Sequence, residues 1–225
     1  IRERPPSARP FDLSRMRQEA IPWLNRLPPR FRLEFEGMAK GADVPIQRIA
    51  EWSYIEQFVN RNCSAAILVV AGDAWVIRNN DSFVPDLWGH VTIRETTGRI
   101  PTISFGMEGD VFTSTGINQE RLWLHYNFLM PWEIPDRAKD SIPAYIFLTE
   151  ALETCHDLKD LELLLESQYR CESMMLFALD GKNGEFAIYE CGGMRHVKRT
   201  TSAAAIAGTN HFCKADGPPL AGGHS

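Results

Sequence analysis

Cys63 is the residue of this sequence best placed to act as a nucleophile. It opens a stretch of two apolar runs, Ser64–Val70 and Ala74–Ile77, which are joined by Ala-Gly-Asp and followed by the polar cluster Arg-Asn-Asn-Asp at 78–81. Apolar runs around such a turn predict a β-hairpin. A cysteine at a strand end can face a cleft, but packing alone would also account for it, because most cysteines are core residues.

A thiol needs a base, because the free group, with a pKa of about 8.5, is only a few per cent thiolate at neutral pH. If the chain is cut before Cys63, the new α-amino group, with a pKa of about 7.7–8.0, lies on the same residue as the thiol. This is the logic of an N-terminal nucleophile. We expect the hairpin to bring Asp81 back beside residue 63, where its carboxylate would hold the amine. A polar turn is the alternative interpretation of residues 78–81.

The other four cysteines, at 155, 171, 191 and 213, are expected to be reduced and buried. Their irregular spacing without a Cys-x-x-Cys pair argues against a thiolate zinc site. Cys155 precedes His156, but neighbours in a helix point to different faces, so this pair is not expected to be catalytic. Reduced cysteines and the lack of an apolar secretory segment favour a cytoplasmic protein.

Composition excludes several classes of function. The 225 residues are 44% hydrophobic and 24% charged, with a net charge of −5, and suffice for one large domain or two small ones. A mildly acidic chain without a basic run is not expected to bind nucleic acid or an anionic membrane. No apolar stretch approaches the length of a membrane span.

The order of elements predicts an α+β fold. Helical spacing covers about 13–27, 30–40 and 44–60. After the hairpin, strands are expected at 91–95, 102–105, 111–115 and 122–128. Helices at about 143–155 and 158–167 follow, the latter capped by Asp157, and then strands at 174–179, 185–190, 196–200 and 203–207. Alternating groups of helices and strands favour helices packed on antiparallel sheets.

Five segments, in order, resemble one family. They are Glu36–Ala42, the hairpin from Cys63-Ser64 to Arg78-Asn79-x-Asp81, the stretch from Gly116-Ile117-Asn118 to Tyr126-Asn127-Phe128, Ile142-Pro143 with its helix, and Thr209-Asn210-His211-Phe212. They are similar to the acyl-coenzyme A:6-aminopenicillanic acid acyltransferase family, also called isopenicillin N acyltransferase-like. Its members are relatives of the choloylglycine hydrolases among the N-terminal-nucleophile hydrolases. The resemblance covers about residues 31–212.

The resemblance implies a four-layer αββα sandwich of antiparallel sheets flanked by helices. Residues 1–62 would be a helical N-terminal segment, as an α chain or propeptide, and residues 63–225 the catalytic core. The family's nucleophile falls on Cys63, and Asp81 and Arg78 fall on residues that organise the amine and the substrate.

The oxyanion contributors of the family fall on two asparagines. Asn210 matches the residue that helps to hold the oxyanion, a contact worth about 2.7–4 kcal/mol, although capping a strand end is its alternative role. Asn127 matches a relative's second oxyanion contributor, and Asn79 joins it as an expected substrate-binding residue.

The implied mechanism is self-cleavage between Asn62 and Cys63, followed by transfer of an acyl group from an amide or thioester to water or an amine. No metal or organic cofactor is required, although a coenzyme A thioester can serve as acyl donor. The expected partners are a small-molecule substrate and the cleaved N-terminal segment as a second chain, with homo-oligomers left open. A non-catalytic scaffold that binds a small molecule or a partner is the alternative, and hydrolase versus acyltransferase stays open.

Two features depart from the family. Asn62 stands where members usually carry glycine, and a bulkier residue restricts the backbone strain that can drive cleavage. Relatives continue beyond Thr-Asn-His-Phe with further strands and a substrate-side arginine, whereas this sequence ends at Ser225. The aromatic residues Trp88, Phe105, Trp123 and Trp132 would line an acyl pocket or fill the core.

Overall fold

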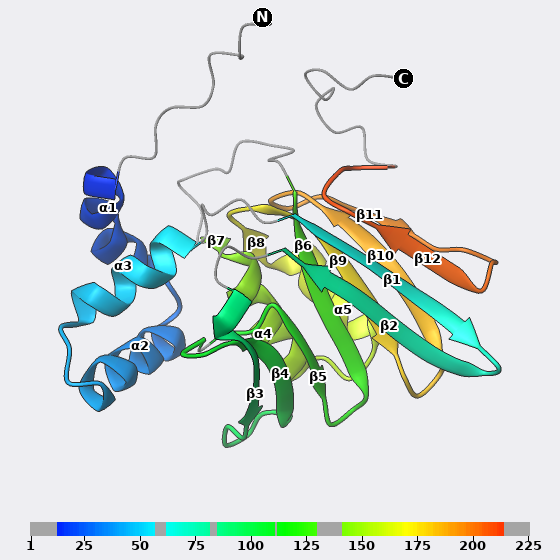
Figure 1. Ribbon diagram of the computed structural model, residues 1–225, viewed down its shortest axis with the longest axis horizontal. Helices are drawn as coiled ribbons and strands as arrows, with labels where there is room; N and C mark the ends of the chain where they lie inside the picture. Colours follow the sequence, from blue (N-terminus) through cyan, green and yellow to red (C-terminus); the bar gives the residue numbers. More distant parts are fainter. Residues whose placement is uncertain (1–12, 57–61, 82–84, 111, 130–140, 214–225) are drawn as a thin grey trace, which may run out of the picture. The chain divides into compact units, whose positions relative to one another are not determined.

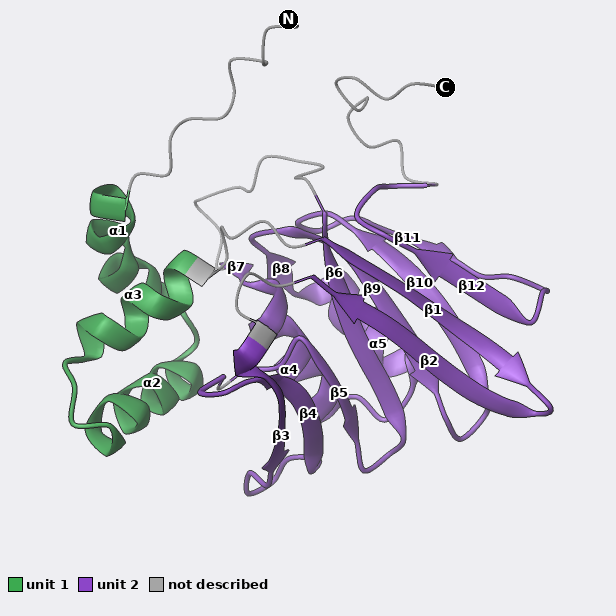
Figure 2. Ribbon diagram, in the orientation of Figure 1, with its two compact units in different colours: residues 1–59 green, residues 60–225 purple. Residues whose placement is uncertain are grey.

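The computed structural model describes residues 13–56, 62–81, 85–110, 112–129 and 141–213. The chain divides into two compact units, residues 1–59 and 60–225 (Figure 2). This division lies close to the expected boundary between Asn62 and Cys63. Three further stretches lie outside the described residues: 1–12, which is rich in Pro and Arg and favours an extended arm, 131–135, which is bounded by prolines and favours a loop, and the Gly- and Pro-rich end from 217.

The first unit holds the three predicted helices, α1 (Leu13–Arg26), α2 (Pro29–Gly41) and α3 (Ile46–Glu56). Pro29 fits the first turn of α2, since the N–H that proline lacks has no helical partner there. Trp23 lies at the centre, with its ring 5.7 Å from that of Phe35 and 5.6 Å from that of Tyr54. The Tyr54 hydroxyl donates to Glu19, so the helices of this unit share a core and a polar contact.

The second unit is built on two antiparallel sheets. Sheet A has the order β12-β1-β2, formed by Ala205–Gly208, Cys63–Val70 and Asp73–Asn80. Sheet B has the order β11-β10-β9-β6-β5-β4-β3, formed by His196–Arg199, Glu185–Cys191, Ser173–Asp180, Leu122–Leu129, Thr115–Asn118, Thr102–Met107 and Trp88–Arg94. A short parallel pair, β7 (Ser141–Ile142) with β8 (Tyr169–Arg170), and the 3-10 turn η1 (Pro85–Leu87) complete it.

The layers follow from which face each sheet buries. Helices α4 (Ala144–Thr154) and α5 (Leu158–Ser167) cover one face of sheet B, and sheet A lies on the other (Figure 1). A hydrophobic core fills the space between the sheets, formed by Ala65, Ile67, Leu129, Met175, Phe177, Leu179, Ile188 and Ile206. The predicted α+β fold of antiparallel sheets with flanking helices is therefore confirmed. Among the described residues, no helix is long and apolar enough to cross a membrane.

One predicted strand is displaced, and one crossing between the sheets was not predicted. The strand expected at 111–115 begins only at Thr115 and runs to Asn118. The strands β11 and β12 are neighbours in sequence but belong to different sheets, so the chain crosses from sheet B to sheet A after Arg199. This crossing places the segment after β12 alongside the start of β1, because β12 pairs with β1.

The turn between β1 and β2 sets the register of the hairpin. Ala71 and Gly72 both have positive φ, 53° and 90°, which is the backbone of a two-residue hairpin turn whose twist matches that of its strands. Val70 therefore pairs with Asp73, and Cys63 pairs with Asn80 at the far end. The sequence had favoured a three-residue loop over Ala-Gly-Asp, which is one residue too long.

Candidate active site

Cys63 is the first residue of β1 and points into the space between the sheets. It is 5% exposed, and burial alternates along β1, with Ala65 and Ile67 buried on the same face. Its Sγ lies 3.4 Å from Oδ1 of Asn80 and 3.9 Å from Nη2 of Arg78. A sulfur beside a guanidinium and an amide is in a polar environment, unlike a core cysteine.

The peptide bond before the nucleophile is held at both ends. The carbonyl oxygen of Asn62 accepts a hydrogen bond of 2.9 Å from the main-chain N–H of Asp81. The N–H of Cys63 donates to Oδ1 of Asn210 over 2.6 Å. The expected cleavage site is thus fixed by one contact from β2 and one from the segment after β12.

Arg78 anchors the site to sheet B. Its guanidinium donates to the main-chain oxygens of Ser114, at 3.3 Å, and Tyr126, at 2.9 Å, and to the hydroxyl of Thr115. These acceptors come from β5, β6 and the turn before β5, so one side chain links both sheets at the nucleophile. Arginine suits this task because its planar fork presents donors in fixed directions.

The two asparagines predicted for the oxyanion meet where the segment after β12 crosses β6. Asn127 is fully buried on β6, and its Nδ2 donates to the carbonyl of Thr209. Asn210 donates from Nδ2 to the carbonyl of Phe128 and accepts the Cys63 N–H at Oδ1. In this arrangement the side-chain oxygen of Asn210 binds the main-chain nitrogen of Cys63, and its NH₂ group is bound to Phe128. The oxyanion roles of both residues stay predictions.

The structure does not bring the Asp81 carboxylate to Cys63. Asp81 is exposed, its carboxylate accepts a hydrogen bond from Nδ2 of Asn79 at 2.7 Å, and among the described residues it has no hydrogen bond to Cys63. The reason is register: a three-residue loop would set residue 81 opposite Cys63, but the two-residue turn sets Asn80 there. Because side chains alternate along a strand, a shift by one residue moves the carboxylate to the other face.

Asn80 and His125 are the site residues that the sequence interpretation missed. Asn80 could have been found from the register of a two-residue Ala-Gly turn. His125 is fully buried on β6, accepts from Trp123 Nε1 at Nδ1 and stacks on Phe177 with ring centroids 4.4 Å apart. Burial, with a second contribution from the charge of Arg78, lowers the pKa of His125 well below its ordinary value. No motif in the sequence indicated that the imidazole of His125 would lie buried and neutral beside the site.

The remaining cysteines differ from Cys63 in their surroundings. Burial raises the pKa of Cys155 to about 12 and that of Cys191 to about 12, which keeps both thiols protonated and unreactive. These two match the expectation of buried cysteines. Cys171 is only partly buried, and Cys213 is exposed, so for Cys213 the expectation is wrong. It lies beyond β12, and its main-chain N–H donates to Glu190.

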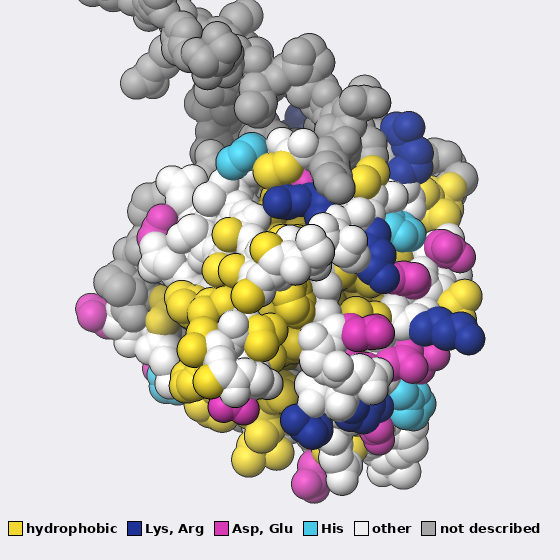
Figure 3. All heavy atoms as spheres, turned by 90° about the vertical axis from the view of Figure 1, so that its right-hand side faces the viewer, with side chains coloured by type: hydrophobic (Ala, Val, Ile, Leu, Met, Phe, Trp, Pro, Cys, Tyr) yellow, Lys and Arg dark blue, Asp and Glu magenta, His cyan; other side chains and the backbone are white. Residues whose placement is uncertain are grey.

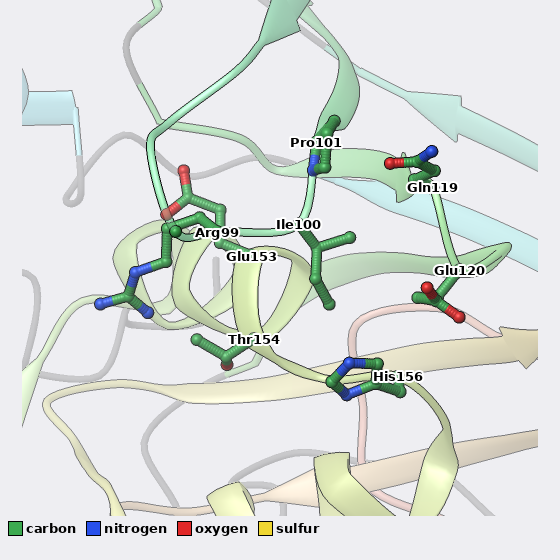
Figure 4. A pocket seen from close by; sticks show the side chains of 9 residues that line it. Arg99, Ile100, Pro101, Gln119, Glu120, Glu153, Thr154 and His156 are labelled. Atoms are coloured by element: carbon green, nitrogen blue, oxygen red, sulfur yellow. The ribbon is translucent and has the colours of Figure 1, made fainter.

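A separate cavity of about 460 Å³ lies at the turn between β5 and β6 and the end of α4. Arg99, Glu153 and His156 are among the side chains around it (Figure 4). It shares no residue with the surroundings of Cys63, and Glu153 is already bound to Arg94 at 2.7 Å. We therefore locate the candidate active site at Cys63 and not at this cavity.

Comparison with known proteins finds a family match. Residues 70–218, more than half of the chain, match the family described as acyl-coenzyme A:6-aminopenicillanic acid acyl-transferase. No curated protein matches the sequence.

Among solved structures, the chain is similar to the N-acylethanolamine-hydrolyzing acid amidase ortholog of Caenorhabditis elegans, with 9% identity and a TM-score of 0.51, over 66% of this chain and 70% of that one. It is also similar to a variant of the conjugated bile acid hydrolase of Clostridium perfringens, with 12% identity and a TM-score of 0.41, over 69% of this chain and 47% of that one. The chain thus spans about half the length of the bile acid hydrolase. The first likeness shows a shared fold, that of the N-terminal-nucleophile hydrolases. The family match shows that the protein belongs to the acyl-coenzyme A:6-aminopenicillanic acid acyltransferase family, as the motifs around Cys63 and Asn210 predict.

Proposed function

We propose that this protein is an N-terminal cysteine amidohydrolase or acyltransferase that matures by cleavage between Asn62 and Cys63. The observation that carries the proposal is the arrangement around Cys63. Its nitrogen is bound by Asn210, and its sulfur lies between Arg78 and Asn80. Family membership supports acyl chemistry at this position.

Maturation is an acyl shift followed by hydrolysis. Sγ of Cys63 attacks the carbonyl carbon of Asn62, the C–S bond forms, the C–N bond breaks, and the thiol proton goes to the departing nitrogen. Water then cleaves the thioester, which leaves a carboxyl group on Asn62 and restores the thiol. The main-chain N–H of Asp81, already on the Asn62 oxygen, stabilises the developing oxyanion.

In the mature enzyme the α-amino group of Cys63 is the base for its own thiol. Asn210 Oδ1 is in place to accept from that amine, which is the task that the sequence had given to the Asp81 carboxylate. The thiolate attacks an amide or acyl-thioester, forms an acyl-enzyme, and passes the acyl group to water or to an amine. A coenzyme A thioester is one acyl donor of the required chemistry, and the cleaved N-terminal segment is the second chain.

Two observations favour a second candidate function. The Asp81 carboxylate is turned toward Asn79, and Asn62 is larger than the usual glycine, which fits an uncleaved scaffold that binds a small molecule or a partner.

Mass spectrometry of the purified protein separates the two functions. A fragment that begins at Cys63, absent from a Cys63→Ser variant, is expected for the enzyme. An intact chain that accumulates no such fragment supports the scaffold. If the protein is an enzyme, a second assay distinguishes hydrolysis from transfer. Amides and acyl-thioesters are added with and without an acceptor amine, because only transfer forms a new amide.

A further inference from the structure

Asn80 faces the nucleophile although the family motif gives it no role. It stands at the unspecified position of Arg78-Asn79-x-Asp81 and pairs directly with Cys63 in the antiparallel hairpin. We propose that Asn80 is a positioning residue for the Cys63 thiol, a role that rests on the function proposed above. The side-chain carbonyl of Asn80 accepts the S–H over 3.4 Å and fixes the direction of the sulfur.

The register makes this contact possible. Residues directly opposite in an antiparallel pair have Cβ atoms about 4.5–5.5 Å apart on the same face, so a short amide side chain reaches the neighbouring sulfur. Neither Asn79 nor Asp81 can do this, because their side chains leave β2 on the other face and bind each other. Asn80 therefore contacts the sulfur of Cys63 from β2, as Arg78 of the same strand does.

The other half of the amide also points to a role at the sulfur. Nδ2 of Asn80 is buried and has no hydrogen-bond partner among the described residues. Buried polar atoms are nearly always paired, so an amide donor left open beside a nucleophile is unusual. An amide holds an acceptor and two donors on one torsion, so Asn80 can accept from the thiol and, after a half turn, donate to the thiolate.

The contact matters most before cleavage, when the amine is not yet available. The Cys63 N–H is then committed to Asn210, and the Asn62 carbonyl to Asp81. With both ends of the peptide bond fixed, the direction of Sγ decides whether it reaches the carbonyl carbon. Asn80 supplies that direction and is unchanged by the reaction, since the thiol proton ends on the Cys63 nitrogen.

The test compares Asn80→Leu with Asn25→Leu, the same change at an exposed position of α1. Leucine keeps the branched shape of asparagine and its number of side-chain heavy atoms, but it replaces both polar atoms with methyl groups. Loss of the contact is expected to slow cleavage on the order of 10²-fold, the effect of a misplacement of about 1 Å. Asn25→Leu, whose side chain is exposed, is expected to cleave at a rate close to that of the unmodified protein. Asn80→Asp, which keeps an acceptor of the same shape, is expected to recover part of the rate.

A spectroscopic readout separates positioning from a purely structural role. The S–H stretching band of Cys63, obtained as the Raman difference from the matching Cys63→Ser protein, moves to higher wavenumber when the acceptor is lost. This shift is expected for Asn80→Leu and not for Asn25→Leu. Asn80→Val, which suits a strand and carries no acceptor, replaces the leucine variant if that protein does not fold.

The outcomes distinguish this inference from the proposed function. An unchanged S–H band in Asn80→Leu, or in Asn80→Val where that variant takes its place, overturns the inference, as does a normal rate of cleavage in the same variant. A shifted band in a protein that never cleaves supports the Asn80 contact and overturns the proposed maturation instead.

Discussion

Arg78 is the residue on which the geometry of the site depends most. It reaches from β2 to three acceptors at Ser114, Thr115 and Tyr126, and its Nη2 lies 3.9 Å from the sulfur of Cys63. A lysine could not replace it, because an ammonium group on a flexible stem cannot bind three acceptors in fixed directions.

Arg78→Lys is therefore expected to lower the free energy of unfolding by about 2–4 kcal/mol, because buried acceptors lose their partners. Urea unfolding measures this change. Arg99→Lys is the control, since Arg99 forms a partly exposed pair with Glu150 and its replacement should cost less than about 1 kcal/mol. Equal losses in the two variants would contradict the anchoring role of Arg78.

His125 makes the stability of the protein depend on pH. Its pKa in the folded chain, lowered by burial and then by Arg78, lies below the value of about 6.5 of an unfolded histidine. As the pH falls below about 6.5, the unfolded chain binds a proton that the folded chain refuses. Stability is therefore full above this pH and is lost on acidification by up to about 1.4 kcal/mol per pH unit, until the folded pKa is reached.

His125→Gln is expected to reduce this loss while keeping an acceptor for Trp123. The measurement is urea unfolding at pH 7.5 and 5.5, and the difference between the two should shrink by about 1 kcal/mol relative to the unmodified protein. His196→Gln tests the same effect at a second histidine, because burial and the charge of Arg170 also lower the pKa of His196. The same pH dependence in His125→Gln and the unmodified protein would rule out the buried imidazole as its source.

At the scale of elements, the segment after β12 carries Asn210 to the nucleophile. β12 ends at Gly208, two residues before Asn210, and it packs over β9. A Cβ atom at Gly208 would overlap the sulfur of Met175 and approach Cζ of Phe177 to 3.1 Å. The absence of a side chain at this position thus lets β12 lie close enough to place Asn210 on the Cys63 nitrogen.

Gly208→Ala is expected to push β12 outward, with a cost of about 1–3 kcal/mol in unfolding free energy. Cleavage at Asn62–Cys63 should slow as well, because Asn210 moves with the strand. The rate is followed by mass spectrometry and the stability by urea unfolding. Ala207→Ser, at an exposed neighbouring position, should change neither. Normal cleavage in Gly208→Ala would show that the position of β12 does not control the site.

At the scale of the whole molecule, the second unit buries its sheets unequally. Helices α4 and α5 cover one face of sheet B, and sheet A covers its other face. On the outer face of sheet A, Trp75 and Ile77 are 58% and 60% exposed. Figure 3 views the side where the β1–β2 hairpin ends and shows a broad area of hydrophobic side chains among scattered charges. Burial in this unit is therefore concentrated between the sheets and under the two helices.

Trp75→Ser is accordingly expected to change the free energy of unfolding by less than about 1 kcal/mol, as at other surface positions. Phe177→Ala, in the core between the sheets, should cost about 3–5 kcal/mol. Both values come from urea unfolding. If Trp75→Ser proved as costly as Phe177→Ala, the outer face of sheet A would have to be covered in the protein in solution.

The sequence by itself determined the local structure and the family. Helical and alternating spacing predicted most elements, including α5 with its cap at Asp157, whose carboxylate accepts from the N–H groups of Lys159 and Asp160. These features depend on neighbours within a few residues, so they can be read from the chain. The family motifs located Cys63, Arg78 and Asn210 for the same reason, since each motif is a short stretch of sequence.

Only the tertiary structure decided which side chains meet Cys63. A turn shorter by one residue put Asn80 there in place of Asp81, because side chains alternate with a period of two. The crossing from β11 to β12 brought Asn210 to the Cys63 nitrogen across 147 residues of sequence, and the burial of His125 followed from the packing of β6 against β9. The register of the hairpin was decided by the backbone of the Ala71-Gly72 turn. The long-range pairings are set by how the sheets pack, and no short stretch of sequence contains that information.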